Sequence, residues 1–162
     1  MGAQMSARDW IRNRRGEWYV LAQGALVLLV LLAPTVDGTS PRLATTTTAV
    51  GSILGVIGLV LAAFGAQNLG PGVSPFPRPK DDTHLVQTGV YAIVRHPIYT
   101  GLTLFALGYS LIWTSMAALV ATAALFVELD MKSRREERWL KEKFDGYGSY
   151  QARVRRLIPF IY

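Results

Sequence analysis

Three side chains that could take part in binding or catalysis lie around one proline in this 162-residue sequence. Arg95, His96 and Tyr99 flank Pro97 where a loop meets a long apolar run. Such groups could orient an anionic ligand or accept a proton, and desolvated polar groups at a bilayer edge are costly enough to suggest a function. Pro97 suits the first turn of a helix, which places His96 near the N-cap and Tyr99 one turn inward. A structural alternative stays open: Arg95 reaches lipid phosphates, His96 caps the helix and Tyr99 belongs to an aromatic belt.

The elements that must position these residues are apolar helices. Hydrophobic residues make up 51% of the chain, charged residues 17%, and there is no cysteine. Uncharged stretches of 19, 35 and 32 residues begin after Glu17, Arg42 and Arg95. A hydrocarbon core of about 30 Å needs roughly 20 helical residues, so these windows predict three or four membrane crossings. This composition excludes a disordered tail, a disulfide scaffold and a zinc-thiolate module.

The predicted fold class is an all-α integral membrane protein with about four transmembrane helices. The first span is expected near 18–33 and is interpreted as retained, because it is longer than a signal-peptide core. The second, near 46–67, contains four glycines and could either pack closely inside the chain or form a homodimer seam. Loop 68–88 holds four prolines and forms no regular helix; it is either functional or a solvated linker.

The third apolar window, 98–127, is too long for one crossing. Trp113-Thr114-Ser115 offers an interfacial aromatic followed by two capping residues, which predicts a short helical hairpin of 98–112 and 116–127. One long tilted helix is the alternative. After Glu128, apolar side chains at helical spacing among charges predict a C-terminal amphipathic cytoplasmic helix, interrupted at Gly146 and Gly148.

Basic residues predict the orientation of this arrangement. With four spans, all lysines and arginines except Arg42 fall on one side, which should be cytoplasmic together with both termini. The net charge of +6 could suggest nucleic acid, but the basic residues flank apolar segments instead of forming an aromatic-rich polar patch, so no nucleic-acid partner is expected.

A longer pattern extends the first cluster. Gly89-x-Tyr91-x-x-x-Arg95-His96-Pro97-x-Tyr99-x-Gly101 is followed by Glu136-Glu137-x-x-Leu140 and then by Phe144, Tyr150, Val154 and Ile158-Pro159. This pattern resembles the isoprenylcysteine carboxyl methyltransferase family and its relatives among membrane phospholipid methyltransferases. The resemblance covers about 68–161 and divides the chain into an N-terminal basic segment with two spans, 1–67, and a methyltransferase core, 68–162.

The resemblance implies a membrane enzyme that binds S-adenosylmethionine from the cytoplasm, releases S-adenosylhomocysteine and methylates a lipid or other hydrophobic acceptor. Membrane lipids and, through the glycine-rich span, a second copy are its further expected partners. It implies that Arg95 orients an anionic group and that Glu137 and Tyr99 take part in catalysis. The cofactor-binding residues it implies are Leu85, Val86, Gly89, Tyr91, His96, Tyr99 and Glu137.

Other chemistry has less support in the sequence. His84 and His96 without cysteine make a poor metal set, so no metal site is expected, and no glycine-rich strand-to-helix loop supports a Rossmann cofactor site. A hydroxyl, thiol or amine acceptor would need a base, for which Glu137 or Tyr99 could serve, whereas a carboxylate would need none.

Three departures from the family pattern leave the acceptor open. Val90 replaces a frequent proline, the spacing between Phe144 and Tyr150 is one residue shorter, and Lys132 stands where carboxyl-methylating relatives carry arginine. Glu136 could share the role of Glu137 or pair with a neighbouring base. Two other classes remain alternatives: a non-catalytic membrane scaffold using the glycine-lined span, and a channel or transporter subunit, for which the spans contain few buried charges.

Overall fold

The computed structural model describes residues 15–35, 40–80 and 82–162 of the chain as a bundle of helices. The long helices are α2 (Glu17–Leu32), α3 (Pro41–Leu69), α4 (Pro97–Ile112) and α5 (Met116–Lys143), followed by the short α6 (Tyr147–Arg153). Short 3-10 turns form η1 (Gly70–Gly72) and η2 (Gly89–Ala92). Within the described ranges the only β-type pairing is an isolated bridge between Val94 and Arg155. The all-helical prediction is confirmed, while the basic segment before residue 15 lies outside the described residues.

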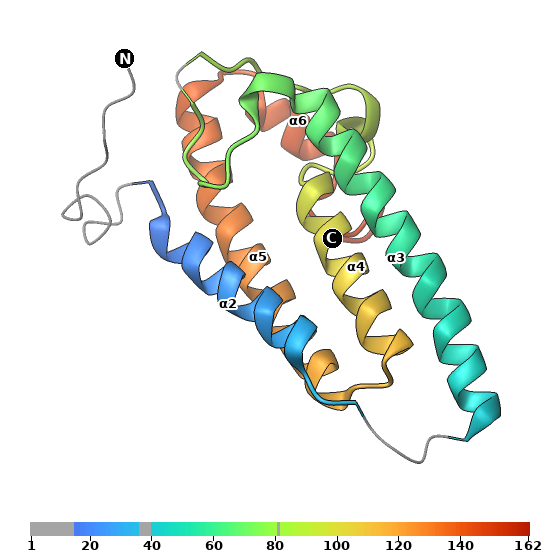
Figure 1. Ribbon diagram of the computed structural model, residues 1–162. Coiled ribbons are helices and arrows are strands. Elements are labelled where there is room, and N and C mark those ends of the chain that lie inside the picture. The colour runs from blue at the N-terminus through green and yellow to red at the C-terminus, as the bar shows by residue number, and fades with distance from the viewer. Residues whose placement is uncertain (1–14, 36–39, 81) are drawn as a thin grey trace.

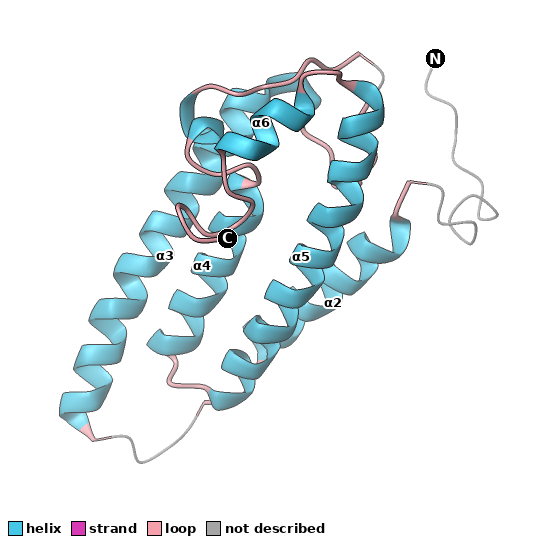
Figure 2. Cartoon of the chain, turned by 180° about the vertical axis from the view of Figure 1, so that it is seen from behind, coloured by secondary structure: helices cyan, strands magenta, loops and turns pink. Residues whose placement is uncertain are grey.

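The four long helices run alternately up and down (Figure 1). α2 packs beside α5, α4 lies against α5, and α3 packs along α4. The start of α2, the loop between α3 and α4, the end of α5 and α6 lie at one end, which we call the loop end; the 113–115 turn lies at the opposite end (Figure 1). Viewed from behind, α6 and the tail that follows it cover the loop end of α4 and α5 (Figure 2).

The predicted break in the third apolar window is confirmed. α4 ends at Ile112, Thr114 takes a positive φ of 49°, and α5 begins at Met116. Ser115 caps α5, because its Oγ accepts a hydrogen bond from the backbone N–H of Ala118 at 3.2 Å. The alternative of one long helix is therefore wrong.

Two details of the predicted C-terminal region are wrong. α5 continues without a break from Met116 to Lys143, so the amphipathic helix is the second half of α5 and the hairpin is not short. Gly146 precedes α6, but Gly148 lies inside it. The change from apolar to charged residues along α5 does not end the helix, because Lys, Arg and Glu are good helix formers.

The glycines of α3 pack inside the chain. A Cβ at Gly51 would stand 2.5 Å from the carbonyl oxygen of Gly108, and one at Gly58 would stand 2.5 Å from that of Gly101. Close approach of α3 and α4 therefore requires glycine at these positions. In the structure these glycines allow α3 to pack against α4. Association with a second copy stays a prediction.

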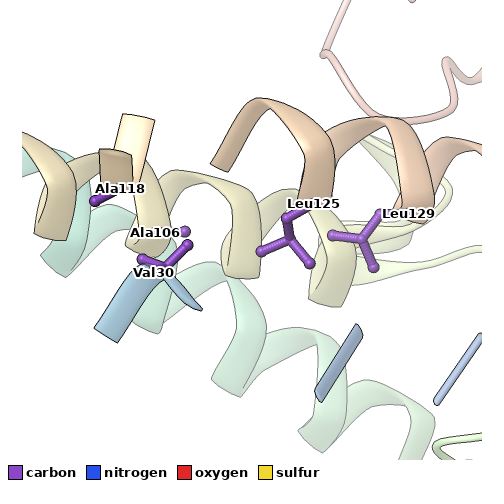
Figure 3. Packing of buried hydrophobic residues seen from close by; sticks show 5 residues of the cluster. All are labelled: Val30, Ala106, Ala118, Leu125 and Leu129. Atoms are coloured by element: carbon purple, nitrogen blue, oxygen red, sulfur yellow. The ribbon is translucent and has the colours of Figure 1, made fainter. Parts of the chain in front are cut away.

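The buried apolar core is small and lies where α2, α4 and α5 meet. Its fully buried members, shown in Figure 3, are Val30, Ala106, Ala118, Leu125 and Leu129. Outside this core many large apolar side chains are exposed, including Ile53, Val56 and Leu59 of α3. Of the described helices, only the segment Pro41–Gly72 is long and apolar enough by itself to cross a membrane; α2 and α4 are apolar but shorter.

Candidate functional site

A cavity of about 350 Å³ lies at the loop end of the bundle. Its walls come from Gln23 within α2, the end of α3, the loop that follows α3, the start of α4, the second half of α5, and α6. The proline-rich loop is therefore part of the site, and its alternative interpretation as a solvated linker is wrong. The volume lies in the range typical of small-molecule sites.

Most of the predicted site residues meet at this cavity. Those among its lining residues are Leu85, Val86, Tyr91, Arg95, His96 and Tyr99. Gly89 and Glu137 are not among them. Gly89 has a φ of +60°, and a Cβ there would stand 2.4 Å from the amide oxygen of Asn68. Gly89 thus shapes the loop against the end of α3 instead of facing the cavity.

Arg95 is buried and tightly held. Its Nε donates to Glu137 Oε1 at 2.7 Å, and its Nη1 donates to the carbonyl oxygens of Gln151, at 3.2 Å, and Val154. The backbone N–H groups of Arg95 and His96 donate to the carbonyls of Arg155 and Arg156. The start of α4 is therefore bound to α5 and to the C-terminal tail, and the interpretation of Arg95 as reaching lipid phosphates is wrong.

Glu137 lies behind the cavity wall as the centre of a polar network. Besides Arg95, it accepts a hydrogen bond from Gln151 Nε2 at 2.9 Å, and its Oε2 lies 3.4 Å from Arg156 Nε. His96 Nε2 lies 3.3 Å from Glu137 Oε1. Burial alone would raise the pKa of Glu137, but the hydrogen bonds and charges of His96 and Arg95 outweigh burial and lower its pKa to about 2. Glu137 is therefore a carboxylate at neutral pH.

Glu136, the neighbour of Glu137, lines the cavity instead. Its Oε2 accepts a hydrogen bond from Tyr99 Oη at 2.7 Å and lies 3.9 Å from His96 Nδ1. The rings of His96 and Tyr99 are stacked, with centroids 5.3 Å apart and planes 1° from parallel. His96 is the N-cap residue of α4 but makes no side-chain capping bond, so its imidazole belongs to this wall of the cavity.

α5 presents one continuous stripe to the cavity. Residues at four-residue intervals line it: Lys132, Glu136 and Leu140 on the helix, and its C-cap residue Phe144. At about 1.5 Å per residue, this stripe covers about 18 Å from the apolar part of the bundle to the loop end. The cavity is therefore charged at its bundle end and apolar at its loop end.

The cavity also contains residues that the sequence analysis did not single out as site residues, and two of them are Tyr147 and Gln23. Tyr147 is 1% exposed and lines the cavity, yet its hydroxyl has no hydrogen-bond partner in the described chain. Tyr150, by contrast, donates to the carbonyl of Tyr91 at 2.6 Å. The second is Gln23, which α2 brings to the cavity. No sequence signal marks either residue, because each acquires its role only through tertiary contact.

Among the residues described, no group of three or more His, Cys, Asp or Glu is arranged to hold a metal ion. The arrangement offers instead a partly apolar cavity with aromatic rings, a carboxylate–tyrosine pair, a buried lysine and an unsatisfied tyrosine hydroxyl. These features suit an elongated ligand that carries charges at one end and an aromatic group at the other.

The chain is similar in sequence to known methyltransferases and to one metal-resistance protein. The family model for phospholipid methyltransferases matches residues 46–146. The chain is 35% identical over 82 residues, 49% of its length, to protein-S-isoprenylcysteine O-methyltransferase of Schizosaccharomyces pombe, and 31% identical over 118 residues, 70% of its length, to the Saccharomyces cerevisiae protein of that name. It is also 29% identical over 151 residues, 91% of its length, to the cobalt-zinc-cadmium resistance protein CzcN of Cupriavidus metallidurans.

These matches confirm the resemblance deduced from the sequence. The chain covers 35%, 49% and 64% of the lengths of the Schizosaccharomyces, Saccharomyces and Cupriavidus proteins. The matched segment 46–146 includes most of α3 and all of α4 and α5 but neither α2 nor α6.

Proposed function

Because this chain belongs to the phospholipid methyltransferase family, we propose that it is a membrane enzyme that transfers the methyl group of S-adenosylmethionine to an amphiphilic acceptor. The observation that carries the proposal is the cavity formed by the Arg95-His96-Pro97-x-Tyr99 segment and the stripe on α5. The two segments, about 40 residues apart in sequence, line one cavity and meet at the hydrogen bond between Tyr99 and Glu136.

The residues present fit this cofactor. S-adenosylmethionine would supply the methyl group of its sulfonium: an acceptor atom would bond to the methyl carbon as the C–S bond breaks, and the sulfur would leave as the uncharged thioether of S-adenosylhomocysteine. Tyr147 has a buried hydroxyl without a partner, which suits a hydrogen bond to a ligand heteroatom. Toward the bundle end of the stripe, one turn from Lys132, Glu136 offers a carboxylate for a cationic amino group.

Other residues position these groups. Glu137 holds Arg95, His96 and Gln151 in place and so fixes the start of α4 relative to α5. Tyr99 and Glu136 share a hydrogen bond at the cavity wall, and this pair could accept a proton from a hydroxyl, thiol or amine acceptor. Correct placement of two reactants away from water can contribute about 7–11 kcal/mol of barrier reduction, which suits a site made of rigid, buried side chains.

The membrane arrangement of the proposal has four spans: α2, α3, α4 and the first part of α5, 116–127. Exposed apolar side chains on α3 and the gathering of basic residues at the loop end support it. The loop end and the cavity would then face the cytoplasm. Because the chain lacks cysteine, Trp113→Cys and Asp145→Cys variants can be labelled with an impermeant maleimide in oriented vesicles. We expect labelling from opposite sides, and labelling of both from one side would contradict the arrangement.

Calorimetric titration of the detergent-solubilised chain with S-adenosylmethionine and S-adenosylhomocysteine tests the activity proposal. We expect saturable binding that His96→Ala and Tyr99→Ala abolish. Tyr147→Phe, which removes only the unpartnered hydroxyl, should weaken binding about tenfold without lowering stability. The matched Tyr150→Phe variant should lower stability, because it removes the hydrogen bond to Tyr91. Absence of binding by the folded wild-type chain would refute the proposed function.

A further inference from the structure

Residues 157–162, which we call the tail loop, form a tight turn with apolar side chains on its outside. The backbone N–H groups of Leu157 and Ile158 both donate to the carbonyl oxygen of Tyr162 at 2.8 Å, which closes the loop. Phe160 is 86% exposed and Ile161 is 76% exposed, and Ile158 beside them is also exposed. Among the described residues, no other large apolar side chain is as exposed as Phe160. A contiguous apolar patch of this kind marks a surface that contacts a partner or a membrane.

The tail loop is attached where α4 and α5 leave the proposed bilayer. Tyr162 Oη donates to Asp130 Oδ1 at 3.1 Å, and Asp130 lies three residues beyond 127, where the proposed span of α5 ends. At about 1.5 Å per residue, this separation is about 4.5 Å along the helix. The carbonyl oxygen of Leu157 accepts a 2.7 Å hydrogen bond from Thr100 Oγ1, near the start of α4. The tail turns back from α6 along α4 and α5 (Figure 2), which in this arrangement brings it to the level of the lipid head groups.

Positive charge accompanies these apolar side chains. The carboxylate of Asp130 is shared by two guanidinium groups, because it accepts hydrogen bonds from Arg134 Nε at 2.7 Å and from Arg156 Nη1 at 3.0 Å. Arg134 also donates to Tyr162 Oη, and its side chain is 56% exposed. Arg155, just before the tail loop, is exposed as well. Arginines beside exposed aromatic and aliphatic groups at a bilayer boundary are complementary to anionic lipid head groups.

We propose that the tail loop is an anchor that binds the anionic lipid surface on the cytoplasmic side of the membrane. Phe160 and Ile161 enter the boundary between head groups and acyl chains, while Arg134 and Arg155 contact lipid phosphates. This inference rests on the membrane arrangement of the proposed function and goes beyond it, because it assigns a lipid-binding surface to a segment outside the four spans.

The anchor is connected directly to the wall of the cavity. The carbonyl oxygens of Arg155 and Arg156 accept hydrogen bonds from the backbone N–H groups of Arg95, at 2.8 Å, and His96, at 3.1 Å. His96 lines the cavity and is the N-cap residue of α4. Binding of the tail loop to lipid would therefore hold the start of α4, and with it this wall of the cavity, at the membrane surface.

Fluorescence quenching by nitroxide-labelled lipids measures the insertion of the tail loop in the full chain, reconstituted in nanodiscs. Because the chain lacks cysteine, Ile161→Cys carries a single fluorophore on the loop. Val56→Cys, at an exposed position of α3, is the reference inside the bilayer, and Asp145→Cys, exposed at the loop end, is the reference outside it. We expect a nitroxide near the head group to quench Ile161→Cys strongly and Asp145→Cys little. Adding Phe160→Ser to Ile161→Cys should reduce the quenching by about half, because serine gains little from leaving water.

The preference for anionic lipid is measured with the same nitroxide on phosphatidylglycerol or on phosphatidylcholine, at equal low mole fractions. We expect phosphatidylglycerol to quench Ile161→Cys about twofold or more strongly. Arg134→Gln combined with Arg155→Gln should bring this ratio close to one, with quenching by phosphatidylcholine retained. The control is Lys141→Gln, which removes an equal charge from an exposed position of α5 that lies about 21 Å beyond residue 127, and it should leave the ratio unchanged.

Three results would overturn the inference: Ile161→Cys quenched no more than Asp145→Cys, equal quenching of Ile161→Cys by the two lipids, or an unchanged ratio after loss of both arginines. The first would give the apolar side chains another occupant, such as a second copy of the chain. Failure of the membrane arrangement is distinguishable, because it would also abolish the quenching of Val56→Cys. Failure of the methyl-transfer proposal would leave all these quenching measurements unchanged.

Discussion

Arg95 and Lys132 are buried cations on two walls of one cavity, and they differ in what surrounds their charge. Arg95 is neutralised by Glu137 at 2.7 Å and donates to two backbone carbonyls of the tail. Lys132 donates to one neutral amide. Two buried cations therefore have different surroundings: Arg95 joins α4, α5 and the tail through a carboxylate and two carbonyls, while Lys132 lines the cavity and contacts a neutral amide.

The largest expected effect comes from breaking the neutralised pair. Arg95→Met leaves the carboxylate of Glu137 buried beside His96 without its strongest partner and removes the bonds to the tail. We expect a loss of about 3–5 kcal/mol in the free energy of unfolding, measured by denaturant titration in detergent. Arg138→Met, at an exposed position of α5, is the control and should change stability little. A loss below about 1 kcal/mol for Arg95→Met would remove the distinction between the two cations.

The same pair predicts a pH dependence of stability. Because the pKa of Glu137 is about 2 in the folded chain and 4.5 as its ordinary value, its ionised form stabilises folding above pH 4.5. This contribution, roughly 3 kcal/mol, is lost as pH falls from 4.5 toward 2. The difference in unfolding free energy between the wild type and Glu137→Gln should be largest at pH 7 and shrink at pH 4 and pH 3. A difference that stays constant over this range would show that the charge of Glu137 is not what stabilises the network.

Features of the fold that depend on neighbouring residues in the sequence were predictable, whereas features that depend on distant residues were not. The turn between α4 and α5 was predictable because Trp113-Thr114-Ser115 carries local capping signals, and Ser115 does cap α5. The continuity of α5 was missed because a change from apolar to charged residues alters the surroundings of a helix and not its backbone preference.

The site was predictable in its members but not in their orientation. The Arg95-His96-Pro97-x-Tyr99 segment does line the cavity. Successive helical residues, however, point about 100° apart, so Glu136 and Glu137 face different partners, and spacing alone did not fix which one meets the cavity. Whether a lysine is neutralised depends on residues such as Gln23 that lie more than a hundred positions away.

A smaller effect should separate the two adjacent glutamates. Glu136→Gln keeps the shape of the side chain but removes the charge that faces the cavity, so affinity for S-adenosylhomocysteine should fall about tenfold. Its stability should change by less than about 1 kcal/mol, because this side chain is 25% exposed and pairs weakly with His96. Titration calorimetry and unfolding of Glu136→Gln and Glu137→Gln give the comparison. If binding were lost only in Glu137→Gln, Glu137 and not Glu136 would be the glutamate that contacts the ligand.

The smallest expected effect is the most informative about Lys132. Without ligand, Lys132→Met removes a buried charge that contacts no carboxylate among the described residues, which favours folding, but it leaves Gln23 Oε1 without its donor, which opposes folding. These effects should nearly cancel, so the unfolding free energy should stay within about 1 kcal/mol of wild type. Gln23→Leu combined with Lys132→Met removes both partners and should be at least as stable as Lys132→Met alone. If Lys132→Met instead cost 3 kcal/mol or more, on the scale of the buried pair, Lys132 would be a structural cation like Arg95 and the contrast between the two walls would fail.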